Sequence, residues 1–249
     1  MRTLVKLSWV ELKLFLREPL TVIFSLALPL IILFVLGGVF GNEPTQPGEQ
    51  LVYRGIGPMT YYVPAYLALV VASVCVISIP THLAGSRERG VLKRFHASSV
   101  SALAVAGAEV AVAFVLSAVS GVMLLIGAQL AYDFEPAISI PAVLGVFALL
   151  ILGFAAFGIF LGAVLPTARA AQAVGMLVWF VMLFLGGAGP PPEVLTDAMR
   201  TVSDFTPLWH AVRMMQEAWL GLDAGLSWFV FGGIAAVSAA LGLRFFRWE

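Results

Sequence analysis

Residues 58–95 read PMTYYVPAYLALVVASVCVISIPTHLAGSRERGVLKRF, an apolar run that ends in a dense cluster of charges. A helix needs about 20 apolar residues to cross roughly 30 Å of hydrocarbon, and residues 58–80 supply them. Charges are costly inside a bilayer, so the cluster over 86–95 must remain at the membrane surface. The stretch therefore predicts a membrane-spanning helix followed by a surface connection.

The composition of the whole chain agrees with this prediction. Apolar residues make up 61% of the 249 residues, charged residues make up 11%, and the mean hydropathy is +0.99. Soluble domains lie far from these values. Further apolar runs lie near 20–40, 101–131, 140–165, 171–189 and 226–246. Because lipid offers backbone amides no hydrogen-bond partner, all six spans should be helices, and we expect one all-α membrane domain over 1–249.

The distribution of basic residues predicts the orientation of these spans. Of the 14 Lys and Arg residues, all except Arg54, Arg200 and Arg213 fall on the side that carries the amino terminus. Basic residues accumulate on the cytoplasmic side of cell membranes, so both termini are expected in the cytoplasm. Most acidic residues fall on the opposite side, and the formal net charge of zero hides this separation. Nothing in the pattern indicates a nucleic-acid-binding surface.

Residues 1–18 have the periodicity of an amphipathic helix. At 100° per residue, one basic stripe spans about 60° of arc and adjoins an apolar stripe. The basic stripe consists of Arg2, Lys6, Lys13 and Arg17, and the apolar stripe of Val5, Trp9, Leu12 and Leu16. We expect this segment to lie along the membrane surface before the first span.

The charged connection after the second span allows two interpretations. If residues 83–97 are helical, Leu92 and Phe95 share one face at i, i+3, and an amphipathic helix lies across the cytoplasmic surface. A plain positive-inside loop is the alternative, which the charges alone favour. The order of the residues favours the helix.

Residues Glu88-Arg89-Gly90-Val91-Leu92-Lys93-Arg94-Phe95 resemble the Glu-Arg-Gly-Thr-Leu-Lys-Arg-Leu signature of the permease subunits of type-2 ABC transporters. Val91 replaces Thr and Phe95 replaces Leu. In that family the segment is the coupling helix, which docks in a groove of the ATPase subunit. The resemblance therefore implies an ATPase-coupling site made of Arg87, Glu88, Arg89, Gly90, Leu92, Lys93, Arg94 and Phe95.

A second resemblance lies between the fifth and sixth spans. Gly189-Pro190-Pro191-Pro192-Glu193 and the block Asp204 to Arg213 are similar to the proline-rich start and the Asn/Thr-Pro-Leu block of the same family. Pro191-Pro192 replaces the usual Leu-Pro. The resemblance implies a re-entrant helical hairpin over 190–213, and the second block is most similar to daunorubicin-type drug exporters. It also implies a multi-pass protein of a bacterial cell membrane.

Absent motifs limit the chemistry of this chain. It contains no Gly-x-x-x-x-Gly-Lys-Ser/Thr phosphate loop, so ATP and Mg²⁺ are expected on a separate ATPase subunit and no cofactor on this chain. It also lacks the catalytic motifs of hydrolases, so we do not expect an enzyme. The lone Cys75 excludes an internal disulfide. The resemblance implies two partners besides the bilayer: an ABC ATPase, and a second permease that is an identical copy or a paralogue.

The fifth predicted span carries a soft, aromatic stripe that is a candidate wall of the substrate path. It consists of Met176, Trp179, Phe180, Met182 and Phe184. Such a wall suits a hydrophobic or amphipathic drug or lipid, whereas bundle core is the structural alternative. The path itself, between two copies and along the first, second and fifth spans, is implied by the resemblance. Export of polysaccharide or teichoic acid is the nearest alternative function, and a secondary transporter or channel is the alternative from another class.

Glu109 is the one acidic residue inside the third apolar run. Carboxylates inside a membrane are candidates for function, although a structural role is the stronger interpretation here. We expect exposure at the membrane interface or pairing with a base such as Arg94 or Arg169. Elsewhere, Gly158-x-x-x-Gly162 predicts a close approach between two helices.

Overall fold

The computed structural model describes residues 23, 27–40, 53, 56–132, 134–191 and 194–248. The surface helix predicted over 1–18 lies outside these residues. All regular elements within the described residues are helical. They are α3 (Leu28–Phe40), α5 (Pro58–Ser73), the π-helix η2 (Val74–Ser78), α6 (Ile79–Glu88), α7 (Val91–Ala97), α8 (Ala102–Ala131), α9 (Ile140–Val164), α10 (Ala168–Leu185), α11 (Asp197–Ser203), α12 (Pro207–Leu220) and α13 (Ser227–Arg244).

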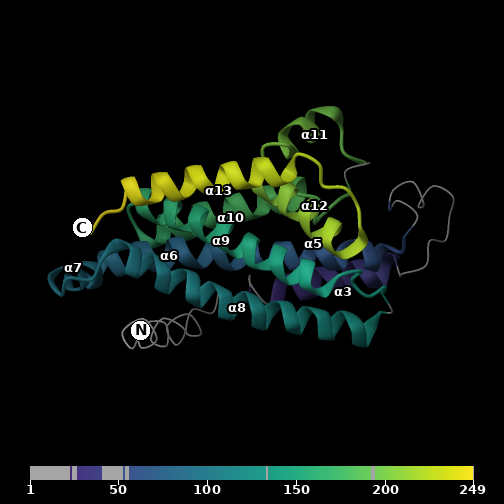
Figure 1. Cartoon of the computed structure of the whole chain (residues 1–249), viewed down its shortest axis with the longest axis horizontal. Helices are drawn as coiled ribbons and strands as arrows, with labels where there is room; N and C mark the ends of the chain where they lie inside the picture. Colours follow the sequence, from purple (N-terminus) through teal and green to yellow (C-terminus); the bar gives the residue numbers. More distant parts are fainter. Residues whose placement is uncertain are drawn as a thin grey trace.

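Five helical segments in this part of the chain are long and apolar enough to cross a membrane. One of them is the continuous run of α5, η2 and α6, and the others are α8, α9, α10 and α13. The five correspond to the predicted apolar runs after the first, and they lie along the long axis of the bundle (Figure 1). The first predicted span, 20–40, is described mainly through α3, whose 13 residues are too few to cross a bilayer alone.

Polar residues cap the start of three long helices. The side chains of Ser101, Ser139 and Thr167 accept hydrogen bonds from backbone amides three residues later, at the starts of α8, α9 and α10. Such caps satisfy amides that have no partner inside the helix. The short polar connections between the apolar runs therefore help to determine where each span begins.

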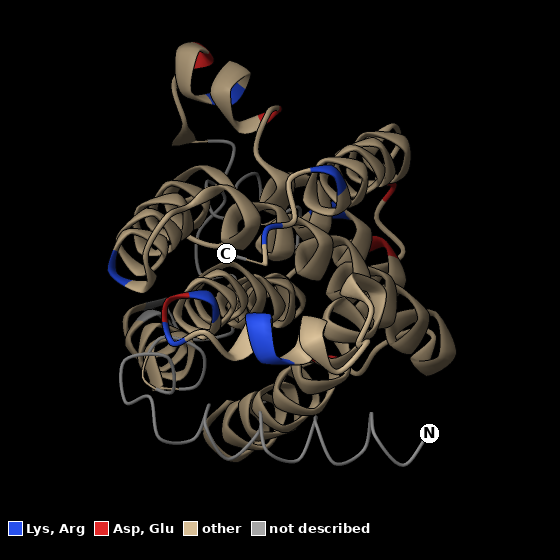
Figure 2. Cartoon of the chain, turned by 90° about the vertical axis from the view of Figure 1, so that its left-hand side faces the viewer, with Lys and Arg blue, Asp and Glu red and all other residues tan. Residues whose placement is uncertain are grey.

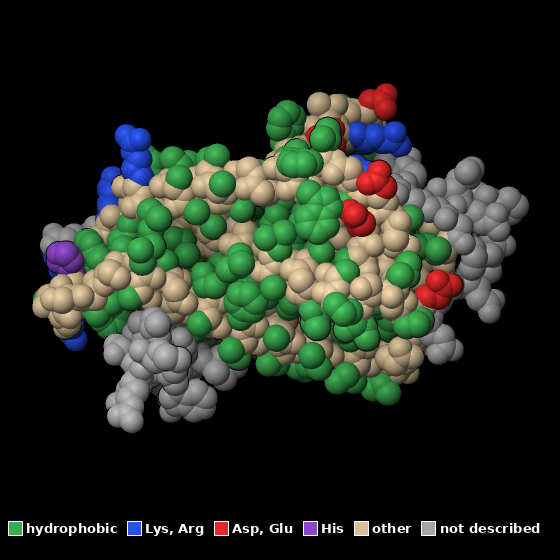
Figure 3. All heavy atoms as spheres, viewed as in Figure 1, with side chains coloured by type: hydrophobic (Ala, Val, Ile, Leu, Met, Phe, Trp, Pro, Cys, Tyr) green, Lys and Arg blue, Asp and Glu red, His purple; other side chains and the backbone are tan. Residues whose placement is uncertain are grey.

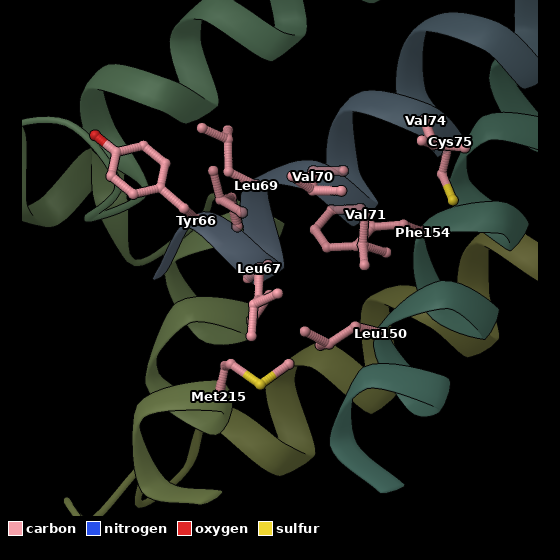
Figure 4. Close-up of a cluster of buried hydrophobic side chains, with 14 of the residues drawn as sticks. Tyr66, Leu67, Leu69, Val70, Val71, Val74, Cys75, Leu150, Phe154 and Met215 are labelled. Carbon is pink, nitrogen blue, oxygen red and sulfur yellow. The ribbon is translucent and has the colours of Figure 1, made fainter. Parts of the chain in front are cut away.

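The central element of the bundle is the second span. All residues of α5 and η2 are buried, and α9, α10 and α12 pack around them together with α6. Figure 4 shows the side chains of Leu67, Leu150 and Met215 converging from α5, α9 and α12. The second span therefore contacts protein rather than lipid along its length.

Glycines allow two neighbouring helices to approach the backbone of this central span. A Cβ atom at Gly158 of α9 would lie 2.1 Å from the Cys75 carbonyl oxygen, and one at Gly175 of α10 would lie 2.6 Å from the Val76 oxygen. A Cβ at Gly162 would lie 3.0 Å from both Pro80 and Leu83. The close approach predicted from Gly158-x-x-x-Gly162 is therefore confirmed, and it occurs at the π-helix.

Charge divides the bundle along its long axis. Figure 3 shows an apolar belt between an end with basic side chains and His, and an end with most of the acidic side chains. We call the first the basic end, since α7, the carboxyl terminus and Arg87, Lys93, Arg169 and Arg244 lie there. Exposed apolar residues of α8, namely Val115, Val119, Val122 and Ile126, contribute to the belt. A multi-pass membrane protein has this distribution, with the bilayer normal along the bundle.

Candidate functional site

The candidate site is the helical connection at the basic end, where the second span turns into α7. α6 ends at Glu88, Gly90 has a φ of 68° in the left-handed region, and α7 begins at Val91. Glycine adopts this conformation without steric cost, so it ends one helix and redirects the chain. The single helix predicted over 83–97 is therefore wrong, because Gly90 divides it into the end of the span and a separate short helix.

α7 is attached to the bundle by its apolar face. Leu92 is 1% exposed and Phe95 packs against the hydrophobic core, whereas Lys93, Arg94 and His96 are exposed. The predicted shared face of Leu92 and Phe95 is confirmed. The helix lies at the extreme basic end of the molecule (Figure 1), and Figure 2 shows this end with its Lys and Arg segments facing the viewer.

Arg87 joins the end of the second span to the end of α9. Its Nη1 donates to the Gly162 carbonyl oxygen at 3.1 Å, and its Nη2 donates to the carbonyl oxygen of Leu165. The last carbonyls of a helix have no partners within the helix, and a cation is favourable at that end of the helix dipole. Arg87 is therefore anchored at the end of α9 and is only partly exposed.

Glu88 makes an equivalent contact at the start of α10. Its Oε2 accepts a hydrogen bond from the Ala168 amide at 3.2 Å, beside the Thr167 cap. A carboxylate is favourable at a helix amino terminus for the same electrostatic reason. Arg87 and Glu88 together tie the end of α6 to both sides of the connection between α9 and α10.

The predicted coupling residues therefore fall into two groups. The first group, Arg87, Glu88, Gly90, Leu92 and Phe95, is engaged by the rest of the chain through hydrogen bonds, backbone conformation or apolar packing, although Glu88 itself is exposed. The second group, Arg89, Lys93 and Arg94, is exposed on the surface. The motif alone does not distinguish these groups, because the acceptors of Arg87 and the donor to Glu88 lie 75 to 80 residues further along the chain. Arg89 in the turn before α7, together with Lys93 and Arg94 of α7, forms a basic surface next to the end of α6, which Arg87 and Glu88 attach to α9 and α10.

Glu109 is buried, and its described partner is a histidine of the second span. Its Oε1 lies 2.8 Å from Nδ1 of His82, and the two side chains are 7% and 11% exposed. This contact with His82 takes the place of the expected pairing with Arg94 or Arg169, because α8 packs against α5 and η2 and brings Glu109 beside the second span. Sequence reasoning missed His82, whose position relative to the third span depends on how the helices pack.

The five residues proposed for the substrate path do not share a surface. Trp179 and Met182 are 0% and 2% exposed, and the Trp179 indole donates to Ser73 Oγ at 2.6 Å. Phe180 and Phe184 are instead 40% and 56% exposed, while Met176 packs partly against the core. The helical period indicates this division, because residues 179 and 182 lie one turn apart and residues 180 and 184 lie on a different face. The second span, also expected on the path, is buried.

The region predicted as a hairpin contains two helices. α11 carries exposed apolar side chains, with Phe205 after it 79% exposed, whereas α12 packs against α5, α9 and α13. Gln216 donates to the Tyr61 carbonyl oxygen at 3.4 Å, and Tyr62 donates to Gly189 at 2.9 Å. The second helix continues to Leu220, beyond the predicted boundary at 213.

Comparison with known proteins relates this geometry to a family. The family model described as "ABC-2 type transporter" matches residues 3–220. The chain is 25% identical over 250 residues to the daunorubicin resistance ABC transporter permease protein DrrB1 of Streptomyces coeruleorubidus. That alignment covers 96% of this chain and 84% of the relative. The family match includes α3 through α12, and hence α7 and the Arg87 and Glu88 contacts that precede it.

Proposed function

The chain belongs to the ABC-2 type transporter family, and we propose that it is the permease subunit of an exporter that moves hydrophobic or amphipathic compounds out of a bacterial cell. It is a multi-pass membrane protein of a family whose members work with an ABC ATPase subunit. In this proposal ATP and Mg²⁺ bind to that ATPase, and both termini of the permease lie in the cytoplasm. The observation that carries the proposal is the attachment of α7 at the basic end.

α7 is the proposed docking element for the ATPase. Its outer surface presents Lys93 and Arg94, with Arg89 beside them, and its inner face is held by Leu92 and Phe95. An exposed basic surface favours association with an acidic one. A partner that binds α7 therefore binds a helix whose apolar face is packed against the bundle.

Movement of α7 would be transmitted into the membrane by three routes. α7 follows directly after α6, which is continuous with η2 and α5. At the end of α6, Arg87 binds the end of α9 and Glu88 binds the start of α10. Packed helices move as discrete units, so a displacement at α7 would shift these helices together. The permease contributes no chemical step in this mechanism.

The exposed aromatic face of α10 supports a substrate of hydrophobic or amphipathic character. Phe180 and Phe184 face outward from this chain, where a second permease could pack to enclose a path. The DrrB1 relative is described as a daunorubicin resistance permease, which supports a drug-like substrate. Exposed Val202 and Phe205 near α11 suit insertion of the predicted hairpin into the outer leaflet.

Charge reversal on the outer surface of α7 tests the coupling proposal. The double variant Arg89→Glu/Arg94→Glu should assemble poorly with the ABC ATPase encoded beside this chain and should show little vanadate-sensitive ATP hydrolysis. Arg244→Glu is the matched control, because Arg244 is exposed at the same end but lies at the end of α13. Wild-type assembly and hydrolysis in the double variant would rule out α7 as the docking element.

A transport assay tests the substrate class and the energy source. Inside-out vesicles that contain the permease and its ATPase should accumulate daunorubicin only when ATP is present. Accumulation driven by a pH gradient without ATP would indicate a secondary transporter instead. Failure to accumulate daunorubicin or other amphipathic drugs, with normal ATPase assembly, would contradict the proposed substrate class alone.

A further inference from the structure

The carboxyl-terminal tail lies against α7. After α13 ends at Arg244, the ring of Trp248 approaches the ring of His96 with centroids 4.7 Å apart. Phe246 contacts Trp248 edge to face at 5.0 Å, and both aromatic residues pack against the hydrophobic core. The tail is thus fastened beside the helix that is proposed to dock the ATPase.

A hollow of about 430 Å³ lies between the tail, α7 and the end of α9. Its lining includes Arg87, Glu88, Lys93, Val164, Pro166 and Arg247. Lys93 comes from α7 and Arg247 from the tail, so both segments contribute a basic residue to the hollow. The family match ends at residue 220, and Arg247 lies beyond it.

The charges of the hollow favour an anionic group. Its lining carries the cations of Arg87, Lys93 and Arg247 against the single carboxylate of Glu88. Lys93 and Arg247 are exposed cations at the hollow. This excess of positive charge favours an anionic group such as a carboxylate.

We propose that the tail and α7 form one composite docking surface, and that the hollow receives an acidic side chain of the ATPase subunit between Lys93 and Arg247. This inference rests on the proposed function, since it adds a second contact to the same interface. The hollow shares Lys93 with the outer surface of α7, so an ATPase seated there also covers the hollow. The phosphate of an anionic lipid is the competing occupant, because basic pockets between membrane helices can bind head groups.

Substitution of Arg247 in the full-length chain tests the inference. The permease is co-expressed with the ABC ATPase encoded beside it, and the ratio of ATPase to permease is measured after affinity purification. Arg247→Glu should lower this ratio about tenfold, because a like charge would face the acidic side chain. Arg247→Lys should retain most of the assembly, and Arg244→Glu should retain all of it.

A second variant probes the attachment of the tail. Trp248→Ala removes the contact with His96 that positions Arg247, so it should lower assembly by a smaller factor, about threefold. Size-exclusion chromatography of each permease alone checks that the fold is intact. Raising the ionic strength should weaken the wild-type complex toward the level of Arg247→Glu, since exposed charges are screened by salt.

The outcomes separate this inference from the proposed function. If Arg89→Glu/Arg94→Glu abolishes assembly while Arg247→Glu assembles like the wild type, the tail has no docking role and α7 acts alone. If neither variant alters assembly, the proposed coupling site fails as well. If Arg247→Glu leaves assembly unchanged but lowers the retention of phosphatidylglycerol, the hollow is a lipid head-group site and the inference is overturned.

Discussion

The carboxylate of Glu88 accepts a hydrogen bond from the amide of Ala168 at 3.2 Å, across 80 residues of chain. Its neighbour Arg87 donates to the carbonyl groups of Gly162 and Leu165. Adjacent residues of opposite charge therefore stabilise the end of one membrane helix and the start of the next. The charged motif therefore connects the end of α6 to α9 and α10 within the permease, and it is also a candidate surface for the partner.

Removal of the Glu88 carboxylate should weaken the connection between α6 and α10. Glu88→Ala should lower the free energy of unfolding by about 0.5–2 kcal/mol, because the Ala168 amide loses its acceptor at the start of α10. Glu88→Gln keeps an acceptor oxygen and should lose less. Thermal unfolding in detergent micelles measures both effects. A normal unfolding temperature in Glu88→Ala, combined with lost ATPase binding, would place Glu88 in direct contact with the partner.

Gly90 should be sensitive to backbone conformation rather than to side-chain volume. A Cβ atom there meets nothing within 4 Å, but its φ of 68° is unfavourable for residues with a branched side chain. Gly90→Val should cost about 1–2 kcal/mol and misplace α7, whereas Gly90→Asn should be milder because Asn tolerates this region. Unfolding temperature and ATPase copurification are the measurements. Equal behaviour of the two variants would contradict the assigned conformation.

Two glycines of α9 should respond to alanine in opposite ways. Gly158→Ala forces a Cβ atom against the Cys75 carbonyl oxygen and should destabilise the bundle by at least about 1–3 kcal/mol. A Cβ atom at Gly145 meets nothing within 4 Å. Gly145→Ala should therefore be neutral or raise the stability by up to about 1 kcal/mol, since alanine favours the helical conformation. The yield of monodisperse protein and its unfolding temperature report the difference. Similar effects at both positions would argue against the close approach of α9 to η2.

His82 and Glu109 should be energetically coupled. Their 2.8 Å contact is largely buried between α6 and α8, where loss of one partner leaves the other polar group without this hydrogen bond. A double-mutant cycle with His82→Ala and Glu109→Ala should give a coupling of about 0.5–3 kcal/mol in unfolding free energy. Denaturant titration in mixed micelles provides the four values. Strict additivity would show that the contact contributes nothing to the stability of the fold.

Substitutions of two neighbouring aromatic residues of α10 should have different effects, one on stability and the other on transport. Trp179→Phe removes the buried hydrogen bond to Ser73 and should lower stability by about 1 kcal/mol. Phe180→Ala changes a more exposed side chain, so it should alter drug transport with little effect on unfolding. Daunorubicin accumulation in vesicles, normalised to the amount of folded complex, distinguishes the two. A transport defect confined to Trp179→Phe would reverse this assignment.

Hydropathy predicted the spans well because each one satisfies a local rule. The runs near 101–131 and 140–165 correspond closely to α8 and α9. Two errors remain, one at a local helix end and one in a contact between helices. The turn at Gly90 divides the helix predicted over 83–97, and Glu109 pairs with His82 rather than with an arginine. The pairing of Glu109 depends on where a distant helix lies, whereas the helix end at Gly90 follows from the left-handed conformation of a glycine.

The sequence by itself determined the class of protein, the positions of its long apolar helices, the separation of charge between the two ends and the apolar face of α7. Those features follow from the cost of burying charge and backbone amides in hydrocarbon, which each segment meets alone. Only the tertiary structure decided that α5 and η2 are central and that Trp179 belongs to the core. It also decided that Arg87 and Glu88 hold two other helices. The physical reason is that lipid and the protein interior are equally apolar, so hydropathy does not distinguish the face of a span that contacts protein from the face that contacts lipid. The close packing at Gly158 and Gly175 identifies the face that contacts protein.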